Sequence, residues 1–197
     1  MAKFPEPPPA ASSAAGTRCW RVYFQGGPHP STWNAFRGFG PTSARFDHHV
    51  APAREQKRQV LYAAAAPLTC LAEVFQDTRT IDRRRRAPWL VAFELARPAV
   101  LLDLSSRWPT QAGASMAINS GPRPRARRWS QAIHAAYPGV QGLLYPSSMN
   151  ANAPAYALYE RATGAIPPRP VFHRAVADAA LTAAIVRAGT RLGYAVV

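Results

Sequence analysis

The chain has 197 residues, 48% of them hydrophobic, and a formal net charge of +14. These values fit one globular domain that is long enough to bury a full hydrophobic core. Because there is no apolar run of about 18 residues and no basic segment followed by an apolar one at the N-terminus, we expect neither a membrane span nor a secretory signal. We therefore expect a cytoplasmic protein.

The high positive charge raises the hypothesis of nucleic-acid binding, since clustered basic residues release counterions from a phosphate backbone. Of the 24 basic residues, 22 are Arg, a bias that a GC-rich genome also produces. The basic clusters are Arg83 to Arg86 and the group Arg123, Arg125, Arg127 and Arg128. Neither cluster is interleaved with aromatic residues that stack on bases, so we interpret both as solvated faces and do not expect a nucleic-acid partner.

The residues that could bind a metal are not spaced as a ligand set. Cys19 and Cys70 are far apart in sequence and lie in apolar surroundings, which predicts reduced core residues. His48 and His49 follow Asp47, but adjacent side chains diverge on a strand or a helix and no second ligand pair is nearby in sequence. We therefore predict no metal site.

The first strand is expected directly after an unstructured segment. Residues 1–16 are rich in Pro, Ala and Ser and have no hydrophobic periodicity, which predicts a disordered lead-in to a single domain at 17–197. Residues 19–24 alternate between two faces in the manner of a strand. Arg21 and Tyr23 therefore share one face of that strand.

The next segments predict a loop, a strand and a helix. Residues 25–49 contain many Gly and Pro residues, which favours a loop that closes over a ligand. Residues 59–66 predict a short apolar strand. A helix is expected to begin at Pro67, because Pro suits the first turn. Its apolar stripe consists of Leu68, Leu71, Ala72 and Phe75.

One acid stands out on this helix. Glu73 is the only charged residue between Arg58 and Asp77 in a chain with ten acidic residues. It lies about 200° from Leu71 around the helix, so it faces away from the apolar stripe. Such a carboxylate is ordinarily solvated, but charged and aromatic residues nearby in sequence could meet it in a cleft. These residues are Arg21, Tyr23, Arg45 and Tyr62.

The rest of the chain interleaves strands and helices. We expect strands at 89–95, 99–104, 139–146 and 154–160, a helix at 125–137, and a C-terminal helix, glycine stop and last strand in the tail. The order lacks the regular alternation and the glycine fingerprint of a doubly wound sheet. The pattern therefore predicts an α+β fold.

Two serines follow the strand expected at 139–146. Ser147 and Ser148 lie where a strand passes into a loop, a common place for ligand contacts. Ser, Asn and Pro also favour turns through their own local hydrogen bonds, and this interpretation is preferred for the segment by itself. No Gly-x-Ser-x-Gly motif surrounds them, so we do not expect a hydrolase nucleophile.

Taken together, five segments resemble the RES domain family, which is named for an Arg, a Glu and a Ser. The matching segments are "WRVY", "FGPTSARFD", "VLYAAAAPLTCLAEVF", "LLDL" followed by Trp108, and "GLLYPSS". The resemblance implies a compact single domain related to the ADP-ribosyltransferase fold, with a split mixed β-sheet and flanking helices. It also implies a bacterial toxin that consumes NAD+, with an Xre-type helix-turn-helix antitoxin as partner; a homodimer is a further candidate assembly.

The resemblance carries over to individual residues. The family's first Arg matches Arg21, its second matches Arg45, and its Tyr, Glu and Ser match Tyr62, Glu73 and Ser147. Ala44 replaces the Gly usually found before the second Arg. The implied catalytic set is Glu73, Arg45 and Ser147. The implied NAD+-binding set is Arg21, Tyr23, Arg45, Tyr62, Ser147 and Ser148.

The chemistry that fits these residues is cleavage of the bond between nicotinamide and ribose. The transition state carries positive charge on the ribose, which a carboxylate stabilises, and the pyrophosphate suits Arg. We expect an NAD+ glycohydrolase or phosphorylase that lowers cellular NAD+ unless an antitoxin neutralises it. The alternatives are an ADP-ribosyltransferase that modifies a protein or nucleic acid and, more distantly, a basic nucleic-acid-binding module without catalysis.

Overall fold

The computed structural model of the chain describes residue 4 and residues 11–197. Eleven strands form two sheets in this part of the chain. The strands are β1 (Ala11–Ser13), β2 (Arg18–Phe24), β3 (Arg37–Gly40), β4 (Arg54–Ala64), β5 (Thr80–Ile81), β6 (Pro88–Glu94), β7 (Ala99–Asp103), β8 (Gly142–Pro146), β9 (Pro154–Tyr159), β10 (Phe172–Ala175) and β11 (Ala195–Val196).

Four α-helices and three short 3-10 helices accompany the sheets. The α-helices are α1 (Pro67–Val74), α2 (Trp108–Gln111), α3 (Arg123–Ala136) and α4 (Thr182–Leu192). The 3-10 helices are η1 (Met116–Ile118), η2 (Glu160–Ala165) and η3 (Ala179–Leu181). Within the described residues, no helix is both long enough and apolar enough to span a bilayer.

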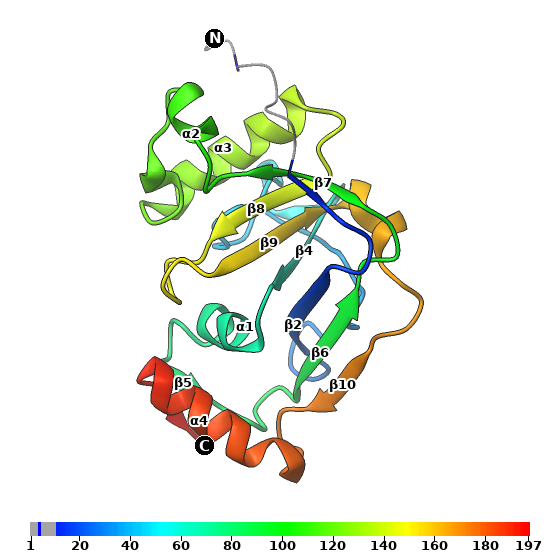
Figure 1. The fold of residues 1–197 in the computed structure, drawn as a ribbon, viewed down its shortest axis with the longest axis vertical. Helices are drawn as coiled ribbons and strands as arrows, with labels where there is room; N and C mark the ends of the chain where they lie inside the picture. The colour runs from blue at the N-terminus through cyan, green and yellow to red at the C-terminus, as the bar shows by residue number, and fades with distance from the viewer. Residues whose placement is uncertain (1–3, 5–10) are drawn as a thin grey trace.

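The main sheet has nine strands and mixed direction. Its order is β1-β7-β8-β9-β4-β2-β6-β10, with β3 attached to β4 (Figure 1). β7 and β8 run parallel, whereas the other pairs of this sheet are antiparallel. A second sheet consists of the parallel pair β5 and β11. The predicted α+β class with a mixed sheet and flanking helices is confirmed.

The main sheet divides between its central strands. β2 pairs with β6 along seven residues, and β4 pairs with β9 along five, but β2 and β4 share only the pair Trp20 and Ala64. Beyond that pair the two strands diverge, so a wedge opens between them in the middle of the sheet. The predicted split of the sheet is located here.

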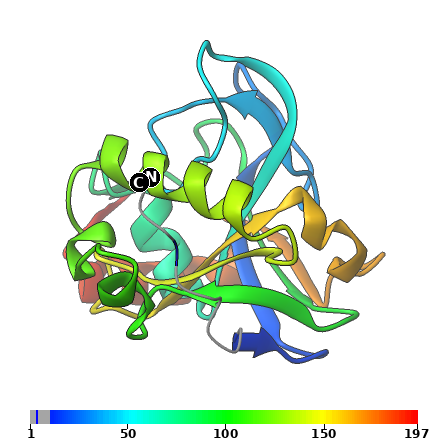
Figure 2. The same ribbon diagram turned by 90° about the horizontal axis from the view of Figure 1, so that it is seen from above.

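The two faces of the sheet are covered differently. A larger hydrophobic cluster joins one face to the α-helices through residues such as Leu71, Ile133 and Ile185. In Figure 1, α3 lies at the same end of the molecule as β7 and β8, α1 lies in the middle beside β4, and α4 lies beyond α1 at the other end; Figure 2 shows the same ribbon from above. A smaller cluster on the opposite face packs against Trp33 and Phe36 of the loop before β3. The loop predicted at 25–49 therefore covers one face, with β3 inside it.

The predicted elements between β4 and β11 are confirmed with small shifts at their ends. β4 begins at Arg54, five residues before the predicted start, because its polar first half pairs with β3. α1 begins at Pro67 as predicted. α4 ends at Leu192 and is followed by Gly193, which adopts the left-handed conformation (φ 64°) that favours Gly. Cys19 and Cys70 are buried and unpaired, as predicted.

The predicted lead-in at 1–16 is not free of structure in the part that is described. The backbone of β1 pairs with β7, and the amide of Gly16 donates to the carbonyl of Leu95. Phe4 packs against Trp108 and Tyr137. Composition missed these contacts because they depend on partners about 80 residues or more away in sequence. The rest of the predicted lead-in lies outside the described residues.

Candidate active site

A small pocket of about 50 Å³ lies in the wedge between β2 and β4, with α1 forming one wall. β2 contributes Arg21 and Val22, and β4 contributes Tyr62, Ala63 and Ala64. The remaining lining residues are Cys70, Glu73 and Val74 of α1 and Tyr145 of β8. The division of the sheet thus leaves a mostly apolar cleft, which holds the charged side chains of Arg21 and Glu73, where an unbroken sheet would have paired backbone.

Alternation along the strands explains which side chains reach this pocket. Tyr62 of β4 is in register with Ala157 of β9, and Ala157 is in register with Leu143 of β8. Tyr145 lies two residues beyond Leu143 and therefore projects from the same face as Tyr62. The small side chains of β9 on this face, Ala155 and Ala157, leave space between the two tyrosines.

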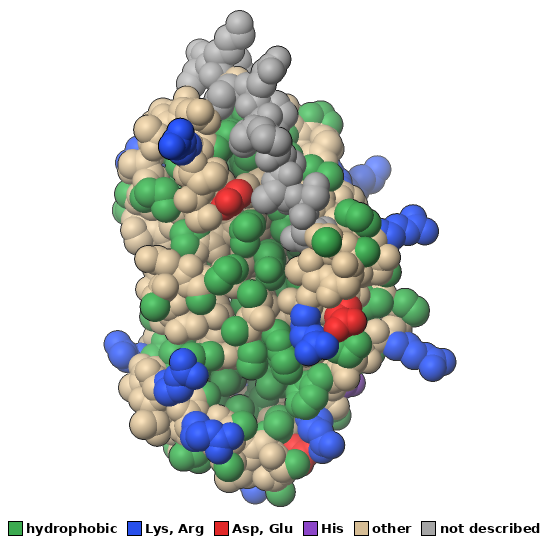
Figure 3. Space-filling view, in the orientation of Figure 1, with side chains coloured by type: hydrophobic (Ala, Val, Ile, Leu, Met, Phe, Trp, Pro, Cys, Tyr) green, Lys and Arg blue, Asp and Glu red, His purple; other side chains and the backbone are tan. Residues whose placement is uncertain are grey.

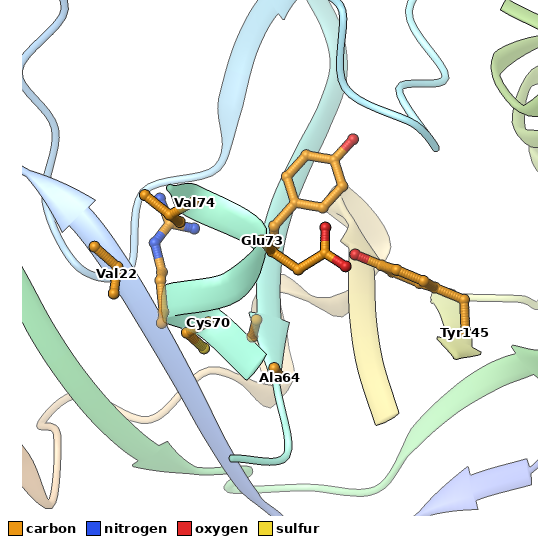
Figure 4. Close-up of a pocket in the computed structure, with 9 residues that line it drawn as sticks. Val22, Ala64, Cys70, Glu73, Val74 and Tyr145 are labelled. Atoms are coloured by element: carbon orange, nitrogen blue, oxygen red, sulfur yellow. The ribbon is translucent and has the colours of Figure 1, made fainter. Parts of the chain in front are cut away.

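Glu73 and Ser147 are joined directly. The hydroxyl of Ser147 donates a hydrogen bond of 2.5 Å to Oε1 of Glu73, and Figure 4 shows the carboxylate turned toward Tyr145. Ser147 is fully buried, although it lies at the end of β8. Its hydroxyl also accepts from the amide of Met149 at 3.2 Å, so the serine shapes the turn as well. The turn interpretation of this serine is therefore confirmed, and its contact with Glu73 places it beside the candidate site.

The polar side of α1 faces protein, not solvent. Thr69 precedes Glu73 by four residues and so lies on the same side of the helix. Its hydroxyl accepts from the side-chain amide of Asn150 at 2.9 Å. The Thr69 and Glu73 pair therefore docks the turn after β8 onto α1. Sequence analysis missed Thr69 and Asn150, although their signal was the four-residue spacing opposite a Ser- and Asn-rich turn.

Arg21 brings positive charge into the pocket with unused hydrogen-bonding capacity. Its Nη2 donates to the carbonyl of Ala35 at 3.2 Å. Its Nε is buried and has no hydrogen-bond partner among the described residues, and none of their carboxylates pairs with it. Burial lowers the pKa of Arg21 to about 10. A buried donor without an acceptor is costly, and an anionic ligand would satisfy it.

Arg45 lies close enough to Glu73 for their charges to interact, but it is not among the residues that line the pocket. Its Nη1 donates to the carbonyl of Gly121 at 2.5 Å. Burial and the positive charge of Arg123 lower the pKa of Arg45, whereas Glu73 opposes that shift. Arg123 itself binds the side-chain oxygen of Gln76 at 2.7 Å. Arg123, the first residue of the basic group on α3, thus lies beside the site, which its sequence did not indicate.

Of the other predicted site residues, Tyr62 lines the pocket, whereas Tyr23 and Ser148 do not. Tyr62 lines the pocket; burial raises the pKa of its hydroxyl, which has no hydrogen-bond partner in the described part of the chain. Tyr23 does not line the pocket, because its hydroxyl bonds Nε2 of His173 at 2.6 Å on β10. Ser148 is exposed. Of the two serines, only Ser147 contacts Glu73.

A second polar cluster, made of two buried histidines and the half-buried Glu160, lies outside this pocket. His48, His134 and Glu160 bring one ligand atom each to within 4.8 Å of one another, so the tertiary structure supplies partners that the sequence spacing lacked. Glu160 bonds Nε2 of His134 at 2.7 Å and Nε2 of His48 at 3.2 Å. His49 bonds Asp47, so the two adjacent histidines diverge as predicted. The geometry is that of a hydrogen-bonded network.

This network predicts loss of stability in mild acid. Burial, reinforced by the nearby His134, lowers the pKa of His48 to about 4. In the unfolded chain the His48 imidazole is protonated below about pH 6.5, whereas in the folded protein it stays neutral until about pH 4. The free energy of unfolding therefore falls as the pH drops from about 6.5 toward 4. We expect a loss of about 2 kcal/mol between pH 7.5 and pH 5 in urea unfolding.

Urea unfolding of variants at the same pH values should distinguish the contribution of His48 from that of the exposed His29. His48→Asn should flatten the pH dependence, and the control His29→Asn should leave it intact. The pKa of Glu160 is also held down, since the hydrogen bonds from His134 and His48 outweigh the burial that would raise it. Its contribution has the same sign but appears only below about pH 4.5. Equal slopes for His48→Asn and the parent would contradict the assignment.

Comparison with known proteins identifies the family. The family model described as the RES domain matches residues 18–183. The chain belongs to the RES domain family. The residues that line the pocket or contact Glu73 all lie inside the matched region of this RES domain.

A solved structure shares the fold of this RES domain. A chain in the crystal structure of the M. tuberculosis MbcT–MbcA toxin–antitoxin complex superposes with a TM-score of 0.53. The two sequences are 15% identical, and the match covers 80% of this chain and 82% of the other. No curated protein matches the sequence.

Proposed function

We propose that this RES domain cleaves NAD+ at the bond between nicotinamide and ribose, as a glycohydrolase or a phosphorylase. The observation that carries the proposal is one pocket that holds both the Glu73 carboxylate, fixed by Ser147, and Arg21 with its unused buried donor. The Glu73 carboxylate would stabilise a cationic ribose, and the Arg21 guanidinium would bind a pyrophosphate. The RES family membership supports the same chemistry.

In the proposed reaction, water or phosphate attacks the anomeric carbon as the carbon–nitrogen bond breaks, and an attacking water releases one proton to solvent. Nicotinamide leaves with the bonding electron pair and becomes neutral, while positive charge develops on the ribose. Glu73 stabilises that charge, more strongly because apolar Val74 and Ala64 lower the local dielectric. The Ser147 hydrogen bond orients the carboxylate before substrate arrives.

Two arginines and two tyrosines would position the substrate. Arg21 would bind the pyrophosphate through Nε, and Arg45, whose charge interacts with Glu73, would add positive charge nearby. Tyr62 and Tyr145 project from one face of the sheet on either side of the alanines of β9. Their rings would form the walls that receive a flat ring.

Purified protein tests the proposal directly. Incubation with NAD+ should release nicotinamide, with ADP-ribose as the other product in water; a phosphorylated sugar formed only in phosphate would identify a phosphorylase. Labelled ADP-ribose bound to protein or nucleic acid would instead identify a transferase. If nicotinamide is released in none of these conditions, the proposal is rejected.

The two serines provide a matched pair for the site. Ser147→Ala should lower the rate of nicotinamide release about tenfold, because it removes a charge-assisted hydrogen bond that orients Glu73. Ser148→Ala should leave the rate within about twofold, since Ser148 is exposed and no hydrogen bond is formed by its side chain in the described structure. Equal rates in the two variants, measured at saturating NAD+, would remove Ser147 from the site.

We further propose that the protein acts as a toxin controlled by an Xre-type helix-turn-helix antitoxin. The structural neighbour, which is the MbcT toxin, was solved in complex with an antitoxin, and this supports a partner of that kind. Expression of this chain alone should arrest growth and lower cellular NAD+. Co-expression of a helix-turn-helix protein encoded by the neighbouring reading frame should restore both growth and cellular NAD+.

The surface drawn in Figure 3 bears on the alternative of nucleic-acid binding. On that face the basic side chains are separated from one another by apolar surface, which does not favour a continuous groove for a polyanion there.

A further inference from the structure

A second and larger hollow adjoins the Glu73 pocket. Its volume is about 450 Å³, against about 50 Å³ for the first. Val74 lines both hollows, and Val22 of the first lies two residues before Phe24 of the second on the same face of β2. The full lining is Phe24, Val74, Phe75, Thr78, Thr80, Asp82, Arg85 and Arg86.

We infer that this second hollow binds the adenylate half of the dinucleotide, with Arg85 and Arg86 as its phosphate-binding residues. The inference rests on the proposed function, because it names where the rest of the same substrate lies. At about 50 Å³ the small pocket cannot hold the whole of NAD+, and the second hollow continues from it along β2. The phosphates would then lie between Arg21 and the Arg85 and Arg86 pair.

Arg86 is held in place before any ligand binds. Its backbone has a φ of 65°, and Ala87 follows with a φ of 47°, a conformation that residues other than Gly rarely adopt. The amide of Gly26 donates to the Arg86 carbonyl at 3.0 Å and fixes this turn. The guanidinium lies 4.5 Å from the centre of the Phe24 ring. Cation–π contact of this kind positions the charge and leaves its donors free.

The charges in the hollow favour an anion that also carries hydroxyl groups. Among the described residues, Arg85 and Arg86 form no ion pair with a carboxylate. Asp82 is the one acid in the lining, and its Oδ1 accepts from the amides of Arg84 and Arg85 at 3.0 and 2.8 Å. Its remaining oxygen could accept from a ribose hydroxyl. A ligand whose phosphate binds the two arginines and whose sugar hydroxyl binds Asp82 is a nucleotide.

The basic run is therefore not a single solvated face. Arg83 is structural, because its side chain donates to the carbonyls of Val176 and Asp178 and to the hydroxyl of Thr182. Arg84 is exposed and does not line the hollow. Only the last two arginines of the run face the candidate site. This division supplies a control variant within the same four residues.

Direct binding tests the inference without requiring turnover. Isothermal titration with ADP-ribose and with AMP should show binding to the parent protein. The double variant Arg85→Gln and Arg86→Gln should weaken both affinities at least about tenfold, because two charge-assisted contacts are lost. The control Arg84→Gln should bind as the parent does. Equal affinity in the double variant and the parent, or no binding of either probe to the parent, would overturn the inference.

Kinetics separates this inference from the proposed function. In the double variant, KM should rise by a larger factor for NAD+ than for nicotinamide mononucleotide, which lacks the adenylate half. Equal factors for the two substrates would contradict the inference and leave NAD+ cleavage standing. If the parent does not cleave NAD+, the proposed function fails, and the titrations still decide whether the hollow binds a nucleotide.

Discussion

Glu73→Gln is expected to lower the rate of nicotinamide release from NAD+ by roughly 100-fold to 1,000-fold. The amide keeps the size of the side chain and an oxygen that can accept from Ser147, so the pocket should keep its shape. What it loses is the negative charge that stabilises the cationic ribose. The rate constant at saturating NAD+ should therefore fall much more than the affinity for ADP-ribose.

The matched control for this variant is Glu55→Gln. Glu55 is an exposed carboxylate on β4, the strand that leads into α1, and its loss changes the net charge equally. It should leave the rate within about twofold, as for other surface substitutions. Chromatographic measurement of nicotinamide, with thermal unfolding of each variant, distinguishes lost chemistry from lost structure. A Glu73→Gln protein as active as the control would refute the role of this carboxylate.

Arg21→Met is expected to raise KM for NAD+ by roughly 30-fold or more without destabilising the protein. Methionine fills much of the space of the arginine stem but has no charge. The folded protein without ligand holds Arg21 with a buried Nε that lacks a partner and with no pairing carboxylate among the described residues. Such a charge costs stability, so its removal should leave the melting temperature unchanged or higher.

A weaker affinity for NAD+ together with an unchanged or higher melting temperature distinguishes a ligand-binding arginine from a structural one. Arg161 is the useful contrast, because its guanidinium donates to the carbonyls of Tyr137, Val140 and His134. Arg161→Met should lower the melting temperature and leave KM for NAD+ near that of the parent. Calorimetry and initial-rate kinetics on both variants give the comparison. A clear loss of stability in Arg21→Met with unchanged KM would assign Arg21 to the fold alone.

The sequence by itself determined the local elements and the chemistry they carry. Pro67 and the stripe through Leu71 placed α1, and alternation placed Arg21 on β2, because these signals depend on neighbours within one or two turns or along one strand. Family motifs then singled out Glu73 and Ser147 before their contact was visible. The spacing of these residues could not show that they touch, since 74 positions separate them.

Tertiary structure alone decided where the strands separate and which side chains share the resulting cleft. The wedge exists because β2 and β4 share one residue pair and then follow different partners, which no local pattern encodes. Tyr23, predicted beside Arg21, is held instead by His173, 150 positions away. Likewise His48 meets His134 and Glu160 only through packing of distant segments. Long-range pairing, which depends on the whole chain, assigns these side chains to a cleft, a core or a network.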